Sequence, residues 1–125
     1  MHKVEDLKIW KKSIELTKLV YRLIVFLPSD EKYGLFSQIK RSVVSIPSNI
    51  AEGAGRSSNK EFKYFLSIEN GSSYELQNQL ILTTEFNLIP KNKIDPIISL
   101  IIEIQKMNYS FQKKLEEISI LNTNI

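Results

Sequence analysis

Cysteine is absent from the sequence, and histidine and tryptophan each occur once among its 125 residues. Without cysteine the chain has no disulfide bonds and no thiolate metal sites, which favours an intracellular protein. The single histidine, His2, lies in a segment that we expect to be mobile. Metal-binding helical bundles use Glu-x-x-His pairs on facing helices, and the sequence contains none. We therefore predict no metal site.

Long apolar segments are also missing. The stretch from Met1 to Lys12 is amphipathic and lacks the apolar core of a signal peptide. The longest apolar stretch, Pro96 to Ile104, is interrupted by Ser99 and Glu103 and is too short to span a bilayer. We expect a soluble, cytoplasmic protein that makes no membrane contact.

Catalytic motifs are equally scarce. The Gly53-Ala54-Gly55 run follows no expected strand and is not completed by a Lys-Ser/Thr pair, so it is not a phosphate-binding loop. The Arg-x-x-x-x-His pattern of helical ribonuclease domains is missing as well. Glu52 and Glu75 are acidic, but the helix pairing expected below places them several turns apart. The sequence predicts a protein without catalytic residues, cofactors or enzymatic activity.

Helical periodicity dominates the chain instead. Hydrophobic residues make up 42% and charged residues 25% of the sequence, which is typical of one globular domain. No long alternation of polar and apolar residues indicates a strand. In four segments, by contrast, apolar residues recur about every 3.6 residues, which is the period of an α-helix. We expect a single domain, 1–125, with helices at about 6–27, 30–56, 59–86 and 93–119. Short loops between them predict an all-α, antiparallel up-down-up-down four-helix bundle.

Proline, serine and glycine mark the helix ends and interruptions. Pro28 ends the first helix, and Pro47 predicts a kink within the second because it removes one backbone hydrogen bond. Ser58 and Glu61 fit a capping box at the start of the third helix. Gly71 within that helix costs about 1 kcal/mol relative to alanine, so we expect it to permit close approach of another helix.

The start of the fourth helix carries weaker signals. We expect it to begin after Pro90 with Asn92 as its cap and with Pro96 tolerated in its first turn. We expect the tail, Asn122 to Ile125, to fray.

The first helix is apolar over an unusually wide arc. Its expected core face comprises Leu7, Trp10, Ile14, Thr17, Tyr21 and Ile24. An adjoining arc comprises Ile9, Leu16, Val20, Leu23 and Leu27. Together the arcs cover about 200° of the helix, where a surface helix needs little more than about 100°. The excess predicts self-association, because soluble monomers rarely expose large apolar patches. The alternative is a tightly closed bundle in which loops cover the excess.

Basic residues concentrate in the first half of the chain. Residues 1–63 hold 12 Lys/Arg and 7 Asp/Glu, and the remainder holds 5 Lys and 7 Asp/Glu. The polar side of the first helix carries the cations Lys8, Lys11, Lys12, Lys18 and Arg22. Glu15 is the one acid among them. This face is a candidate for sequence-tolerant contact with the phosphates of RNA or DNA. A solvated helix face that maintains solubility is the alternative.

A polar stripe follows one face of the second helix. Its members are Arg41, Ser45, Asn49 (or Ser48), Glu52 and Arg56. If the second and third helices pair about the Ser57-Ser58 turn, Glu75 is the candidate partner of Arg41, and Lys63 that of Glu52. We expect Arg41 and Glu75 to form a partly buried ion pair. The stripe is interpreted as a charge-paired seam between helices, with a binding surface shared between subunits as the alternative.

Several short motifs resemble a known family. They are Asp6-Leu7 with Trp10, Tyr33-Gly34-Leu35, Gln38-Ile39, the run from Ser45 to Gly53, Gly55-Arg56, Gly71-Ser72 and Glu75-Leu76. The chain resembles the four-helix-bundle proteins encoded in intervening sequences of bacterial 23S rRNA genes. Within that resemblance, Glu69-Asn70 and Ser73 depart from the family pattern and leave the local packing open.

This resemblance implies a ring-shaped homopentamer. The family also looks related to the accessory variability protein of diversity-generating retroelements, a basic pentamer that binds a reverse transcriptase and nucleic acid. The sequence therefore favours a pentameric accessory protein that associates with RNA or DNA, with a reverse transcriptase or another protein as a further candidate partner. The alternative is a protein-binding scaffold that makes no nucleic-acid contact.

Overall fold

Four long helices form the molecule. The computed structural model describes residues 2–31 and 34–123, and side chains as far as Ile118. The long helices are α1 (Lys8–Ile24), α2 (Leu35–Ala54), α3 (Asn59–Glu85) and α4 (Lys91–Thr123). Short 3₁₀ helices, η1 (Val4–Asp6) and η2 (Ser29–Glu31), precede α1 and α2. These described residues contain no strand, which confirms the all-α prediction.

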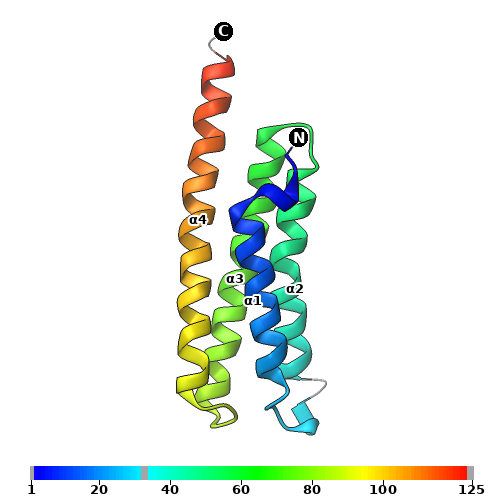
Figure 1. Ribbon diagram of the computed structural model, residues 1–125, viewed down its shortest axis with the longest axis vertical. Coiled ribbons are helices and arrows are strands. Elements are labelled where there is room, and N and C mark those ends of the chain that lie inside the picture. The colour runs from blue at the N-terminus through cyan, green and yellow to red at the C-terminus, as the bar shows by residue number, and fades with distance from the viewer. Residues whose placement is uncertain (1, 32–33, 124–125) are drawn as a thin grey trace.

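The long helices lie side by side along one axis (Figure 1). α1 contacts α2 and α4, and α3 also contacts α2 and α4, so four seams enclose one core. α4 reaches further along the axis than the turn between α2 and α3 (Figure 1). In the part of the chain that the structure describes, no helix is both long and apolar enough to cross a bilayer.

A serine marks the start of α3, and an asparagine marks its end. The Ser58 hydroxyl accepts a hydrogen bond from the Glu61 backbone N–H at 3.2 Å, which confirms the capping box. Ser58 Oγ in turn donates to the Glu61 carboxylate at 3.1 Å. At the other end of α3, Asn87 adopts a left-handed conformation with φ 57°, and the Leu88 N–H bonds back to the Thr83 carbonyl at 2.8 Å. Asparagine tolerates this conformation, so it can end a helix as glycine does.

The expected start of α2 and the expected cap of α4 are wrong. Ser29–Glu31 forms a separate 3₁₀ turn, and α2 begins only at Leu35 because Gly34 has non-helical backbone angles. α4 begins at Lys91, directly after Pro90, so Asn92 lies inside the helix rather than capping it. Pro96 consequently lies in the second turn. Tyr33 and the last two residues of the tail lie outside the described residues.

The buried face of α1 is not the expected one. Its buried residues are Ile9, Ser13, Leu16, Val20, Leu23 and Ile24. The core is therefore built mainly from the arc beside the expected core face, of which Ile24 alone among the described residues of α1 is buried. Leu7, Trp10 and Ile14 are only half-buried, and Tyr21 is 40% exposed. Ser13 permits this orientation because its hydroxyl bonds to the Trp10 carbonyl at 2.6 Å and so does not lie in the core unpaired.

Close approach between helices occurs at Gly53, and the prediction for Gly71 is wrong. A methyl group added at Gly53 would lie 2.7 Å from Phe62 Cδ1 and 2.9 Å from Phe65 Cβ. Gly71 is exposed, and nothing lies within 4 Å of the position that its methyl group would take. Pro47 is buried within α2, which nonetheless continues as one helix to Ala54.

The N-terminal segment, for which the sequence predicts mobility, contacts the bundle. The His2 backbone N–H donates to the Ala54 carbonyl at 3.0 Å. Its imidazole packs edge-on against Phe62 and Phe111, with ring centroids 5.0 and 6.2 Å away. His2 therefore joins the end of α2, through its backbone, to the start of α3 and to α4, through ring packing.

Candidate functional site

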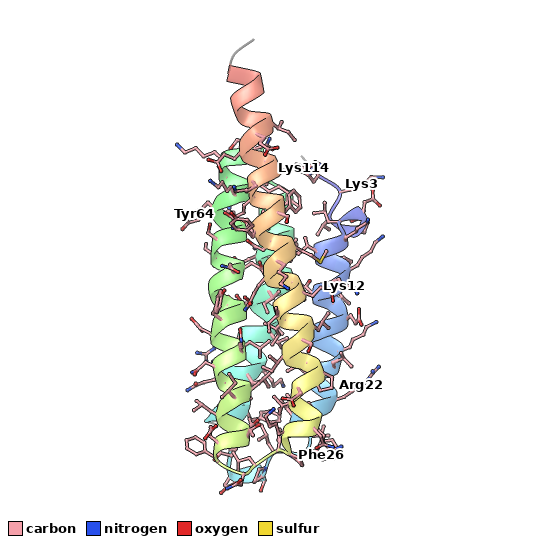
Figure 2. The ribbon with its side chains drawn as sticks, turned by 90° about the vertical axis from the view of Figure 1, so that its left-hand side faces the viewer. Lys3, Lys12, Arg22, Phe26, Tyr64 and Lys114 are labelled. Atoms are coloured by element: carbon pink, nitrogen blue, oxygen red, sulfur yellow. The ribbon has the colours of Figure 1, made fainter. Side chains whose placement is uncertain are left out.

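The basic face of α1 is the first candidate surface. Lys8, Lys11, Lys18 and Arg22 are exposed and, within the described chain, form no ion pair. Lys12 differs because its ammonium lies 3.8 Å from Glu15 and 3.5 Å from Glu103 of α4. The basic side chains follow one edge of the molecule, where Figure 2 labels Lys12 and Arg22. This edge presents four cations to solvent.

The seam between α2 and α3 holds part of the predicted polar stripe. Ser45 Oγ and Ser72 Oγ lie 2.7 Å apart across the two helices. Asn49 Nδ2 donates to the Ser45 carbonyl at 2.8 Å and to Ser45 Oγ at 2.9 Å. Ser45 and Asn49 therefore act as a small half-buried network that joins the helices, rather than as an open surface.

Both ion pairs expected across this seam are wrong. Arg41 and Glu75 are exposed, and among the described residues no ion pair joins them. Glu52 bonds to Arg56, one turn along its own helix, at 2.5 Å. Lys63 instead contacts Glu116 of α4 at 3.3 Å. A partner one turn away is available without any constraint from helix packing, so these charges pair locally or with α4.

Arg56 has a second contact in addition to this ion pair. Its guanidinium carbon lies 4.7 Å from the centre of the Phe65 ring. Arg56 and Glu52 thus cover the turn between α2 and α3, and both side chains remain more than 40% exposed.

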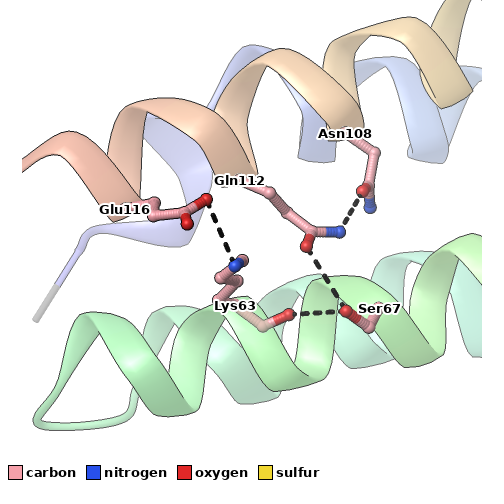
Figure 3. A network of polar contacts seen from close by, with 5 residues as sticks. All are labelled: Lys63, Ser67, Asn108, Gln112 and Glu116. Carbon is pink, nitrogen blue, oxygen red and sulfur yellow. Dashed lines mark hydrogen bonds and ion pairs between the residues drawn. The ribbon is translucent and has the colours of Figure 1, made fainter.

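A buried polar layer between α3 and α4 was not predicted from the sequence. Asn108, only 1% exposed, donates to the Leu66 carbonyl at 2.7 Å and to the Glu69 carboxylate. The network continues outward, because Gln112 Nε2 donates to Asn108 Oδ1 at 2.6 Å and Ser67 donates to Gln112 Oε1 at 3.3 Å (Figure 3). The outermost member is the Lys63–Glu116 ion pair (Figure 3).

Glu69 is the group in this layer whose pKa is strongly shifted. Its side chain is fully buried, and its Oε1 atom has no hydrogen-bond partner among the residues that the structure describes. Burial raises the pKa of Glu69 to about 7, against the opposing effect of the hydrogen bond from Asn108. A carboxyl group in such surroundings favours its neutral form. The described residues contain no cluster of three or more histidine or acidic side chains that could hold a metal ion.

The positions of Glu69 and Asn108 carried a signal that sequence reasoning missed. Glu69 lies three residues after Leu66 on the buried face of α3, and Asn108 lies four residues after Ile104 on that of α4. Polar residues at core positions of two helices pair where they can, because an unpaired buried polar group is costly. This rule predicts that each of them needs a partner, and the packing of α3 against α4 then makes them partners of one another.

A family model places the chain among known proteins. The model of the 23S rRNA-intervening sequence protein family matches residues 5–110. The chain belongs to this family. A comparison with curated proteins finds no match. Among solved structures, the chain is similar to a protein with unknown function from the S23 ribosomal protein family of Bacteroides thetaiotaomicron VPI-5482, with 28% identity and a TM-score of 0.78. The alignment covers 84% of this chain and 98% of that one.

The 23S rRNA-intervening sequence family match includes the motifs quoted from the sequence, and the structure explains several of them. Ser45 and Asn49 join α2 to α3, and Gly53 admits the Phe62 ring. Glu69 and Ser73, which the sequence analysis singles out as departures from the family pattern, are both fully buried. Each bonds to a residue of α4, Glu69 to Asn108 and Ser73 to Gln105.

Proposed function

We propose that this antiparallel four-helix bundle assembles as a ring-shaped homopentamer and acts as a non-enzymatic accessory factor that binds RNA or DNA through the basic face of α1. The observation that carries the proposal is the row of exposed, unpaired cations formed by Lys8, Lys11, Lys18 and Arg22. Each is free to contact a phosphate without breaking an existing ion pair.

Phosphate contact fits the geometry of this face. The cations lie on one continuous helix, and phosphate recognition needs charge rather than a shaped pocket. Lys12 is held by Glu103, so we expect it to contribute less than its neighbours. Weak contacts repeated around a ring would act together, because the first contact raises the effective concentration of the others.

Assembly into a ring is supported by the family resemblance and by exposed apolar side chains. Val25 is 73% and Phe26 56% exposed at the end of α1, and Val44 on α2 is 40% exposed. The apolar surface is smaller than the sequence indicated, because Leu7, Trp10 and Ile14 are half-buried against the bundle. Burial of the remaining apolar side chains between copies would remove them from water.

A non-enzymatic role agrees with the state of the buried carboxylate. Glu69 is the described group with a strongly raised pKa, and such groups are often catalytic. Here, however, the side chain is sealed from solvent within the α3–α4 seam. A substrate would have no access to it, so Glu69 is better explained as part of the helix contact.

A mobility-shift titration with a structured RNA at low and physiological salt tests the proposal. We expect Lys8→Glu/Lys11→Glu to weaken binding and to reduce the slope of log K against log salt by about 2 per protomer. Lys60→Glu/Lys91→Glu is the matched control, since it changes the net charge equally on other exposed helix ends. If the two variants bind the RNA equally well, the basic face of α1 is not the nucleic-acid surface.

A protein-binding scaffold is the second candidate, and a groove between α1 and α4 favours it. Leu7, Ile9, Met107 and Phe111 contribute apolar side chains to this groove, whose volume is about 540 Å³. Lysines also line it, including Lys114 (Figure 2). If wild type shows no shift even at low salt, the scaffold becomes the favoured function.

A further inference from the structure

A cleft of about 300 Å³ follows the outer side of the α3–α4 seam. Every residue that lines it has a polar group on its side chain: two tyrosines, four amides, two lysines and one glutamate. This lining contrasts with the mainly apolar floor of the α1–α4 groove. A cleft of this composition suits a polar ligand with flat surfaces, because tyrosine rings stack and amides form hydrogen bonds.

The pairing of the two helices places each tyrosine level with an amide. Residue numbers rise along α3 as they fall along α4, with Lys63 beside Glu116 and Ser67 beside Gln112. One turn further on, this pairing sets Asn70 level with Tyr109. Another turn sets Tyr74 level with Gln105. The two rings therefore lie on opposite walls, about 6 Å apart along the helix axes.

Both rings are accessible. Tyr74 is 57% and Tyr109 64% exposed, although both line the cleft. Solvent therefore reaches more than half of each side chain, and exposed aromatic rings of this kind stack on the bases of single strands.

Gln105 is held in place, and both Gln105 and Asn70 still have unpaired side-chain atoms. Gln105 Nε2 donates to Gln77 Oε1 at 2.9 Å and to Ser73 Oγ at 3.3 Å, which fixes the orientation of its side chain. Within the described chain, Gln105 Oε1 and the Asn70 side-chain amide have no hydrogen-bond partner. These groups can therefore recognise the N–H and C=O groups on the edge of a base.

Charge at the rim favours an anionic ligand. Lys113 lies with its ammonium 5.4 Å from the centre of the Tyr109 ring, at the edge of the cleft. Lys63 is already paired with Glu116, so Lys113 is the cation available to a phosphate. We propose that this cleft binds one nucleotide, with its base stacked on Tyr74 and Tyr109, its edge bonded to Asn70 and Gln105, and its phosphate beside Lys113. This second site uses no side chain of the basic face of α1.

The test measures binding of a fluorescently labelled single-stranded oligothymidylate by anisotropy at low salt. Tyr74→Leu and Tyr109→Leu should each weaken binding about fivefold or more, because they remove a stacking ring but retain apolar bulk. Tyr64→Leu is the matched control, since Tyr64 is 62% exposed on α3 and does not line the cleft. It should bind as wild type does. Circular dichroism establishes that all three variants remain folded.

Competition identifies the source of the nucleotide. Displacement by free thymidine monophosphate shows that one nucleotide suffices, whereas displacement only by unlabelled oligothymidylate shows that the site requires a strand. Either result supports the proposal when the two cleft variants are also impaired. Equal affinity for all three tyrosine variants overturns it, and so does displacement by a neutral oligosaccharide but by neither nucleotide ligand.

The α1 variant separates this site from the proposed function. If Lys8→Glu/Lys11→Glu abolishes binding while the cleft variants bind normally, the basic face stands and the cleft is refuted. If the cleft variants are impaired while the α1 variant binds normally, the cleft stands and the basic face is refuted.

Discussion

The α2–α3 and α3–α4 seams share one helix but use opposite chemistry. Between α2 and α3, a glycine lets aromatic rings approach the backbone, and one hydroxyl pair provides the polar contact. Between α3 and α4, a buried carboxyl group and several amides form a chain of hydrogen bonds that reaches solvent. Close packing stabilises the first seam. The second accepts a desolvated acid and presents polar groups that a ligand can use.

The largest expected effect concerns Glu69. Its pKa in the folded protein is about 7, above its ordinary value of 4.5, so folding takes up a proton between these values. The contribution of Glu69 to the free energy of unfolding is therefore highest below about pH 4.5 and falls by about 3 kcal/mol as the pH rises to about 7. Glu69→Gln should remove this fall, so the variant should be the more stable protein at pH 8. Urea titrations of both proteins across this range provide the measurement. Parallel pH curves for the two proteins would mean that Glu69 is not desolvated.

The two glycines provide the next contrast. Gly53→Ala should destabilise the protein by about 2 kcal/mol, because its methyl group would overlap Phe62 and Phe65. Gly71→Ala should stabilise it by about 0.5–1 kcal/mol, since the site is an open helix position. Chemical denaturation compares them directly. A stable Gly53→Ala protein would show that the α2–α3 seam can move apart and is not closely packed.

The hydroxyl pair in the α2–α3 seam should have a smaller effect. Ser45→Ala or Ser72→Ala should each cost about 1 kcal/mol, and the double variant should cost less than their sum because the two groups share one contact. Ser67→Ala, in the exposed part of the α3–α4 seam, is the control and should cost less. Additive losses for Ser45 and Ser72 would show that the two hydroxyls act independently.

Arg41→Ala and Glu75→Ala should have the smallest effects. Both side chains are exposed and no ion pair joins them, so each change should alter stability by less than about 0.5 kcal/mol. Thermal unfolding of the single and double variants checks this. A coupling free energy of more than about 1 kcal/mol between the two changes would support the partly buried ion pair that the sequence predicts.

Local signals made much of the fold predictable. The capping box at Ser58 and the proline before Lys91 depend on neighbouring residues alone, so they could be recognised without knowledge of the tertiary structure. The orientation of α1 could not be recognised in this way. Both of its arcs are apolar, and the choice between them depends on Ser13, which enters the core because it bonds to its own backbone.

The candidate sites also differ in how far the sequence predicts them. The cations of α1 could be predicted because exposed charges on one helix depend only on its periodicity. The Glu69–Asn108 contact joins residues 39 positions apart, and recognising it requires the relative rotation of two helices. The prediction for Gly71 was wrong for the same reason, because only the facing helix determines which glycine is crowded.

Lysine footprinting tests the proposed nucleic-acid surface most directly. The protein is acetylated with and without a structured RNA at low salt, and the reactivity of each lysine is measured by mass spectrometry. We predict that RNA protects Lys8, Lys11 and Lys18 of α1, while Lys60 and Lys91 at the starts of α3 and α4 stay reactive. Protection should disappear as salt rises. Unchanged reactivity at Lys8, Lys11 and Lys18 in the presence of bound RNA would contradict the account.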